Sequence, residues 1–425
     1  MTTLIVLTFV AAYTAIALEH PIRINKAASA LVGAGVLWTI YAVMGHDLAL
    51  LDRQLDSSLA ETAQIVFFLI GAMTIVEVID AHNGFEVITP LVRTKKQVTL
   101  LWTLSFVTFF LSAILDNLTT TIVMIALVRK LLDRQADRLI TAAMIVIAAN
   151  AGGAWSPMGD VTTTMLWIGG QISPPAVVAD VFLPALINVM VPLLALSVLL
   201  RGEVVVAPVA QMESGRVRPF ERNLMFFVGL ALLAGVPAFK TATHLPPFMA
   251  ILFGLGLLWI VGEVIHRGKQ DDEKQGLTLA SALKRIDMSS IVFFVGILLS
   301  VAVLEHTHIL ASLAQALTRT IGRIDIIVVL LGLLSAIIDN VPLVAATISM
   351  YPLDQFPPDS FLWLFIAYCA GTGGSILIIG SAAGVAAMGL ETITFGWYLK
   401  RMSGLALLGY LAGAAAYIVQ YRLLH

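Results

Sequence analysis

Two Asp-Asn pairs, Asp116-Asn117 and Asp339-Asn340, lie near the middle of long apolar runs of the sequence. An ionised Asp near the centre of a bilayer costs at least ~3 kcal/mol on insertion scales, so it is rarely there without a function. Carboxylate, amide and hydroxyl oxygens can replace the hydration shell of a small hard cation. The oxygen-bearing residues in and around the pairs are Asp116, Asn117, Thr119, Thr120, Ser335, Asp339 and Asn340. They predict a cation-binding site, and the alternative role of the two Asp residues is to cap helices at a hairpin turn.

A third polar cluster interrupts the apolar run over residues 139–169. Three glycines and a proline stand within ten residues of this run, which a regular helix does not accommodate cheaply. The oxygen-bearing side chains beside the break include Asn150, Asp160, Thr162 and Thr163. A purely structural kink would not need Asp160. We therefore predict that Asp160 handles an ion or a proton, and that Na⁺ binds at Asp116, Asn117 and Asp160.

The apolar run over residues 361–389 carries a matching glycine-rich segment. Its oxygen-bearing side chains include Thr372, Ser375 and Ser381, and the segment has no carboxylate before residue 389. We predict a second broken helix here, which contributes hydroxyl groups to the same ion- and proton-binding site. Outside these clusters, Glu305 and His308 lie toward a helix end, where a histidine could sense pH because it titrates near neutrality.

The composition places these clusters in a membrane protein. Apolar residues make up 59% of the 425 residues, charged residues make up 12%, and the mean hydropathy is +0.93. These values lie far from those of soluble globular domains. The net charge of -2 offers no basic face for nucleic acid, and the single cysteine predicts neither a disulfide nor a thiolate metal cluster. We expect contact with membrane lipid and no cofactor.

Ten apolar runs are long enough to cross ~30 Å of hydrocarbon. They lie near residues 2–18, 28–45, 62–81, 139–169, 176–200, 219–238, 247–265, 288–305, 361–389 and 402–420. Two further runs, 98–131 and 324–350, carry the Asp-Asn pairs. If both are re-entrant hairpins, most of the 25 Lys and Arg residues fall on one side, as they do on the cytoplasmic side of membrane proteins. We therefore expect a multi-pass protein of a bacterial inner membrane with both termini outside, in the periplasm.

The two halves of the sequence repeat each other. Leu111 to Asn117 reappears as Leu334 to Asn340, with six of seven residues identical and an offset of 223. Five crossings in each half is an odd number, so the second half must enter the membrane upside down, as in the inverted repeats of secondary transporters. We predict an all-α polytopic fold: a first repeat over 1–200, a linker over 201–218 and a second repeat over 219–425. Each repeat has five crossings, a re-entrant hairpin and a broken helix.

Motifs of enzymes give little support to catalysis. The sequence has no H-E-x-x-H pair for zinc, no G-x-S-x-G nucleophile elbow and no phosphate-binding loop. An intramembrane aspartyl protease stays a remote alternative, because such enzymes pair two aspartates within the membrane. Its Gly-x-Gly-Asp turn is incomplete here, since Met158-Gly159-Asp160 lacks the first glycine.

The Asp-Asn pairs, the broken helices and the duplication together resemble the ion transporter superfamily, and within it the NhaD-type sodium/proton antiporters. The resemblance covers nearly the whole chain. Its most specific parts are Glu19-His20-Pro21 with Asn25-Lys26, 115–121, 150–163 and 338–342. It implies a scaffold domain, a moving transport domain that carries the hairpins, and a homodimer. The expected activity is alternating-access, elevator-like exchange of Na⁺ or Li⁺ for H⁺, with a carboxylate among Asp116, Asp160 and Asp339 that holds either Na⁺ or protons.

A sodium-coupled carrier of dicarboxylates or other anions is the alternative within the same superfamily. Dicarboxylate carriers that look similar have Ser-Asn-Thr at both hairpin tips. This sequence has Asp116 and Asp339 in the serine position, and Val341-Pro342 leaves no threonine at the second tip. Because added negative charge in a partly dry cavity repels an anion, the sequence favours a cation as the substrate. Arsenite-type exporters are a weaker alternative.

Overall fold

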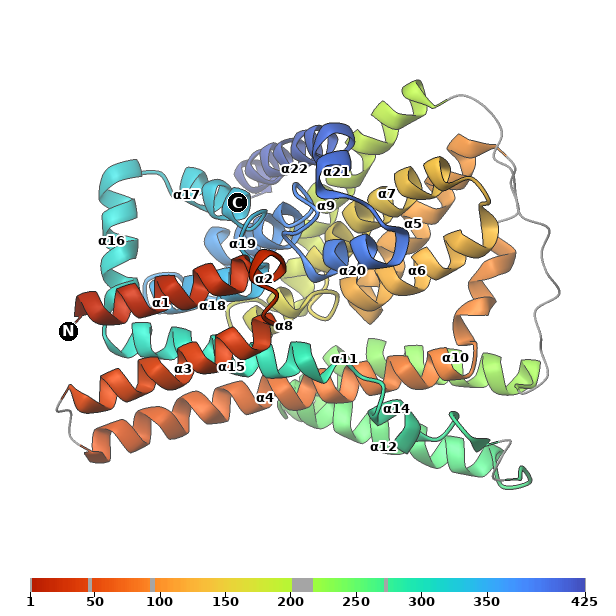
Figure 1. The fold of residues 1–425 in the computed structure, drawn as a ribbon, viewed down its shortest axis with the longest axis horizontal. Helices are drawn as coiled ribbons and strands as arrows, with labels where there is room; N and C mark the ends of the chain where they lie inside the picture. Colours follow the sequence, from red (N-terminus) through yellow and green to blue (C-terminus); the bar gives the residue numbers. More distant parts are fainter. Residues whose placement is uncertain (1, 45–47, 92–95, 201–216, 271–273, 425) are drawn as a thin grey trace.

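The computed structural model describes residues 2–44, 48–91, 96–200, 217–270 and 274–424, and these residues form helices and no β-strand (Figure 1). The helices of the first half are α1 (Thr2–Ala17), α2 (Glu19–Ile22), α3 (Lys26–Val43), α4 (Leu48–Ala81), the 3₁₀ helix η1 (Gly84–Leu91), α5 (Gln97–Leu115), α6 (Asn117–Leu131), α7 (Gln135–Ala154), α8 (Val161–Ile168) and α9 (Pro174–Leu199). Those of the second half are α10 (Pro219–Ala234), α11 (Val236–Thr243), α12 (Pro247–Ile265), α14 (Leu279–Leu283), α15 (Met288–His306), α16 (Ile309–Ile321), α17 (Ile324–Leu334), α18 (Asn340–Met350), α19 (Phe361–Gly373), α20 (Ala382–Glu391), α21 (Phe395–Arg401) and α22 (Ser403–Leu424).

The described residues contain seven helices that are long and apolar enough to cross a membrane, or eight if α10 and α11, bent by 43°, form one span. The all-α polytopic membrane fold is thus confirmed. Two of the ten predicted crossings, 139–169 and 361–389, are each divided into two shorter helices at their glycines. The predicted run 62–81 is the second part of α4, which begins at Leu48. Its first turns escape a hydropathy search because they carry charged residues.

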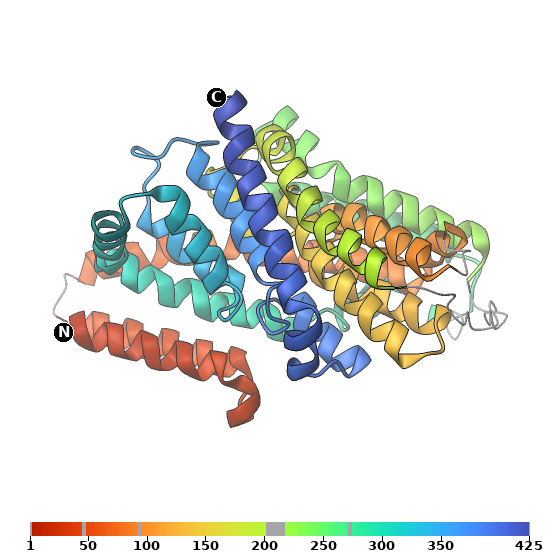
Figure 2. The ribbon, with the colours of Figure 1, turned by 90° about the horizontal axis from the view of Figure 1, so that it is seen from above.

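The helices form two groups. In one, α3 packs on α1 and α15, and α4 packs on α12 and α15. In the other, α5 packs on α7, α17 packs on α19, and α9 lies along α22 (Figure 2). The two groups lie one above the other in Figure 1. Contacts of α15 with α18 and of α4 with α8 join them, so residues of both groups can meet at one site.

The order of broken elements is the same in both halves. A helix pair interrupted at Asp-Asn (α5–α6, α17–α18) is followed by a pair interrupted at glycines (α7–α8, α19–α20) and then by a long helix (α9, α22), which the short α21 precedes in the second half. The outer ends of all four helix pairs lie within four residues of the ends of the corresponding predicted runs. The re-entrant course of the hairpins and the inverted orientation of the halves stay predictions, since α5 is by length and composition able to cross a membrane. Most of the predicted linker, residues 201–216, lies outside the described residues.

A buried pair of histidines joins α4 and α12 just beyond their C-terminal ends. The rings of His82 and His266 are parallel within 2°, with centroids 5.2 Å apart, and their Nε2 atoms are 3.2 Å apart. His82 Nδ1 lies 2.7 Å from the carbonyl oxygen of Val78, which can only accept, so Nδ1 carries the proton. Neutral His82 then accepts at Nε2 from His266. Burial lowers the pKa of His82 to about 4, and burial together with the Lys269 ammonium lowers the pKa of His266.

We expect this pair to make the protein sensitive to acid. His82 stays neutral in the folded protein and takes up a proton only on unfolding. Its contribution to the free energy of unfolding is therefore fully present above pH 6.5 and is lost as the pH falls toward about 4. The loss for His82 is at most about 3 kcal/mol. Thermal unfolding in detergent between pH 7.5 and 4.5 should show a smaller fall of the midpoint in His82→Phe than in wild type. The exposed-residue variant His244→Asn should follow wild type, and equal falls in all three would contradict the prediction. None of these variants alters Glu221 or Lys269, which form an ion pair near the histidines.

Candidate functional site

Asp160 stands at the break between α7 and α8. Its backbone is extended and its side chain caps α8: Oδ1 accepts from the amide N and from Oγ1 of Thr162, both at 2.9 Å. The glycines fix this place, because a Cβ at Gly153 would lie 2.3 Å from the carbonyl oxygen of Gly159. Asp160 is only 2% exposed. The break therefore holds a buried carboxylate whose position is determined by the helix that it caps.

The amides of the two Asp-Asn pairs converge on this carboxylate. Asn117 Nδ2, from the first turn of α6, donates to Asp160 Oδ2 at 2.6 Å. Asn340 Nδ2, from the first turn of α18, donates to the same oxygen at 3.3 Å. Every donor to Asp160 named so far is neutral. A neutral donor set stabilises a carboxylate but does not cancel its charge, so the charge remains available to a cation or a proton.

Asn150 extends the network to the second glycine-broken pair. Its Oδ1 accepts from Asn117 Nδ2 at 3.0 Å, and its Nδ2 donates to Ser375 Oγ and Ser381 Oγ, both at 2.9 Å. Asn150, Ser375 and Ser381 are buried. The three residues connect the break between α7 and α8 to the break between α19 and α20. All four interrupted helix pairs therefore contribute to one polar network.

Asp116 occupies the single position between α5 and α6. Its Oδ1 accepts from the amide N of Thr119 at 2.8 Å and its Oδ2 accepts from Thr119 Oγ1 at 2.7 Å. Its backbone has φ 118° and ψ 160°, a region that is essentially restricted to glycine and costs a side-chain-bearing residue on the order of 1–3 kcal/mol. A capping role alone would not require this conformation. The strain is consistent with a side chain held in place for function.

Asp339 caps α18 and also forms an ion pair. Its Oδ1 accepts from the amide N of Val341 at 3.3 Å, and its Oδ2 lies 3.1 Å from Lys26 Nζ, at the start of α3. Both Asp residues at the hairpin turns are thus helix caps, as the alternative interpretation stated. Capping does not exclude ion binding, because each carboxylate also lines a cavity.

That cavity has a volume of about 60 Å³ and is lined by all three of Asp116, Asp160 and Asp339, together with Asn117 and Asn340. Lys26, Met73, Leu118, Thr119, Ser290 and Ala382 line both this cavity and a larger one of about 550 Å³. The larger cavity also contains Glu19, Glu77, Asp80 and Arg285. The site therefore adjoins a vestibule on the side of the molecule where α2 and α14 lie.

Comparisons with known proteins agree on the class of protein. A family described as "Citrate transporter" matches residues 5–371. The sequence is 49% identical to "Sodium/proton antiporter 1" of Arabidopsis thaliana, over 98% of this chain and 72% of that protein, and 46% identical to "Sodium/proton antiporter 2" of the same plant, over 97% and 98%. It is 32% identical to "Na(+)/H(+) antiporter NhaD" of Vibrio cholerae, over 97% of this chain and 90% of that protein.

The chain belongs to the transporter family described as "Citrate transporter", and the relatives named above as sodium/proton antiporters match nearly its whole length. Its NhaD-type resemblance is confirmed, because relatives with that name match nearly the whole chain. The transporter is a multi-pass membrane protein and not an enzyme, which sets aside the intramembrane protease.

Four predicted site residues of the transporter do not bond to the Asp160 carboxylate: three donate to backbone carbonyls and one has no hydrogen-bond partner among the described residues. Thr163 Oγ1 donates to the carbonyl of Asp160 at 2.9 Å, Ser335 Oγ donates to Ala370 at 3.1 Å, and Thr372 Oγ1 donates to Tyr368 at 2.7 Å. Thr120 Oγ1 is buried with no hydrogen-bond partner. None of these four residues lines the 60 Å³ cavity. The polar side chains bonded to the Asp160 carboxylate are instead those of Asn117, Thr162 and Asn340, and Asn150 bonds to Asn117; the sequence had identified all four.

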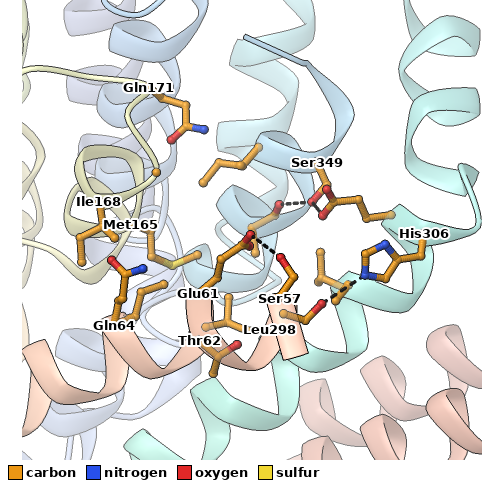
Figure 3. A pocket seen from close by; sticks show the side chains of 18 residues that line it. Ser57, Glu61, Thr62, Gln64, Met165, Ile168, Gln171, Leu298, His306 and Ser349 are labelled. Carbon is orange, nitrogen blue, oxygen red and sulfur yellow. Dashed lines mark hydrogen bonds between the residues drawn. The ribbon is translucent and has the colours of Figure 1, made fainter. Parts of the chain in front are cut away.

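A second vestibule of about 460 Å³ lies between α4, α8, α15 and α18 (Figure 3). Glu305 lines it and accepts from Ser349 Oγ at 2.7 Å. His308 does not line it, whereas His306 does, with Nε2 3.1 Å from Ser58 Oγ. Within the part of the chain that the structure describes, no residue lines both this vestibule and the 60 Å³ cavity. His306 and Glu305 are therefore exposed to this vestibule, whereas pH sensing at Glu305 or His308 stays a prediction.

Sequence reasoning missed Lys26 as a residue of the site. In the sequence, Lys26 stood out only as part of the Asn25-Lys26 motif and as one of the 25 basic residues used to orient the protein in the membrane. The observation that could have identified it is its position: it starts α3, and a positive charge at a helix N-terminus is unfavourable without a compensating partner.

Proposed function

We propose that this transporter exchanges Na⁺, and also Li⁺, for H⁺. The observation that carries the proposal is the buried carboxylate of Asp160, which both halves of the protein surround with neutral donors. Na⁺ and H⁺ can each neutralise one carboxylate, but not at the same time. Competition for Asp160, with Asp116 as the second carboxylate of the cavity, therefore couples the two fluxes without a separate device. The relatives named as sodium/proton antiporters support the same substrates.

The family description raises an anion carrier as the second candidate. The cavity argues against it on two grounds. A site that holds a water molecule needs roughly 10–15 Å³, so about 60 Å³ suits a small cation with a few waters and not citrate in this conformation. Three carboxylates line the cavity, and among the described lining residues the one cation, Lys26, is paired with Asp339. A citrate anion would meet net negative charge.

We propose the following cycle and setting. The group that contains the interrupted helices moves as an elevator against the group formed by α1, α3, α4, α12 and α15, and H⁺ entry drives Na⁺ export. The vestibule next to α2 and α14 then faces the cytoplasm, and the vestibule of Figure 3 faces outward. Both termini lie outside a bacterial inner membrane, and the working unit is a homodimer, as the resemblance implies.

Proton flux in energised vesicles tests the substrates. The vesicles carry an acid-inside proton gradient, which a fluorescent amine reports. Addition of NaCl or LiCl should collapse the gradient at once, while potassium citrate and KCl should not. Vesicles without the transporter give the background. Collapse with citrate, or Na⁺-dependent uptake of labelled citrate without any effect of Na⁺ on the gradient, would contradict the proposal and support the anion carrier.

A further inference from the structure

Lys26 and Asp339 form an ion pair at the edge of the site cavity. Lys26 Nζ lies 3.1 Å from Asp339 Oδ2 and 4.5 Å from the centroid of the Phe293 ring. The side chains are 25% and 16% exposed, so the pair is partly shielded from water. The Lys26 amide N also donates to Glu19 Oε1 at 3.1 Å. Contacts from three different helices therefore hold this lysine in one place.

A lysine is an expensive choice at this position. Ordering its long side chain costs entropy, and the first turn of a helix disfavours positive charge. The opposite charge of Asp339 and the face of Phe293 offset these costs. A charge that served only the orientation of the protein in the membrane would have no need of such contacts and would lie in the aqueous layer.

The pair lies across the two groups of helices and next to Asp160. Lys26 starts α3, which packs on α1 and α15, whereas Asp339 caps α18 at the hairpin turn. Lys26 lines both the 60 Å³ cavity and the vestibule beside it. Asn340, the neighbour of Asp339, donates to Asp160. A cation that passes from the vestibule to Asp160 therefore moves close to the Lys26 ammonium.

We propose that Lys26 is a built-in competing cation, which neutralises Asp339 and repels the transported cation, so that it sets the affinity of the site. This inference rests on the proposed exchange of Na⁺ for H⁺. It assigns opposite electrostatic effects to two residues that contact each other. Loss of Lys26 leaves a negative charge unpaired beside the site, and loss of Asp339 leaves a positive charge unpaired there.

The two single variants should shift the apparent KM for Na⁺ in opposite directions. For charges that line one partly dry cavity, the expected change is about tenfold each way: lower in Lys26→Gln and higher in Asp339→Asn. The double variant Lys26→Gln/Asp339→Asn should return to within about threefold of wild type, because both charges are then removed. KM is measured from collapse of the proton gradient at fixed pH over a range of NaCl concentrations.

Lys240→Gln is the matched control. Lys240 Nζ also lies over an aromatic ring, 4.8 Å from the centroid of Trp167, but it lines none of the three cavities. Its removal should leave KM unchanged. Lys26→Met, which keeps an apolar stem over Phe293, serves if the glutamine variant does not assemble, and it should also lower KM.

The outcomes separate this inference from the proposed function. Exchange in wild type with unchanged KM in both single variants, or with a fall in the maximal rate alone, would overturn the role of Lys26 and leave Na⁺/H⁺ exchange intact. Absence of Na⁺-dependent exchange in wild type would overturn the proposed function and this inference with it. Opposite shifts that cancel in the double variant would support both.

Discussion

Replacement of Asp160 by Asn should reduce Na⁺-dependent collapse of the proton gradient to the level of vesicles without the transporter. The change removes the one carboxylate on which donors from α6, α8 and α18 converge. An amide cannot take up a proton in exchange for Na⁺. It also offers one acceptor oxygen in place of two, so either the Thr162 donors at Oδ1 or the Asn117 and Asn340 donors at Oδ2 lose their acceptor, at a cost of about 1–3 kcal/mol. The variant should assemble with somewhat lower stability.

Two further Asp→Asn variants are compared with Asp160→Asn. Asp137→Asn changes a hydrogen-bonded carboxylate at the other end of α7, where Oδ1 accepts from Gln97 Nε2 at 2.8 Å, and should keep wild-type exchange. Asp116→Asn keeps an N-cap of nearly equal quality while it removes the charge. Wild-type KM for Na⁺ should rise as the pH falls, because protons compete. Exchange with unaltered pH dependence in Asp160→Asn would show that Asp160 is not the shared carboxylate.

Much of the site was predictable because polar residues are costly within a membrane and therefore stand out in apolar runs of the sequence. The run 324–350 became α17 and α18 with the same outer bounds, and the run 98–131 became α5 and α6 with a difference of one residue at the first end. Apolar runs bounded by charge fix such limits. The breaks at Asp116 and Asp339 followed from polar residues that a continuous apolar helix would not carry. Asp160 lies beside the glycine break as the N-cap of α8.

Contacts between residues that are far apart in the sequence could not be predicted in the same way. The spacing of Asn117 and Asn340 places each at the start of a helix, but no local rule brings both amides to Asp160, 43 and 180 residues away. No local rule pairs Lys26 with Asp339 either, because the two residues are 313 positions apart. Ser335 and Thr372 were predicted at the site, but their hydroxyl groups donate to backbone carbonyls instead. Hydroxyl groups in helices have backbone carbonyls within reach, so a polar residue at membrane depth need not face the site.

Alanine at Gly152 or Gly373 should disrupt the transporter strongly, because the added methyl group would meet backbone atoms of a neighbouring helix. A Cβ at Gly152 would lie 2.2 Å from the carbonyl oxygen of Phe109, and a Cβ at Gly373 would lie 2.0 Å from that of Gly332. Both obstacles are backbone, which cannot turn aside as a flexible side chain can. The two positions correspond in the repeat: α7 approaches α5 at the first, and α19 approaches α17 at the second.

Each substitution should force a helix pair apart at a cost of about 1–3 kcal/mol or more, because overpacked cores shift backbone. The glycine breaks next to these contacts position Asn150 and Ser375, so exchange should fall even in protein that assembles. Gly256→Ala is the matched control, since a Cβ there meets nothing within 4 Å and α12 gains a better helix former. Thermal unfolding in detergent and gradient collapse should be measured for all three variants. A midpoint within 2 °C of wild type, about 1 kcal/mol or less for a chain of this size, in both Gly152→Ala and Gly373→Ala would contradict the close backbone contact of these helix pairs.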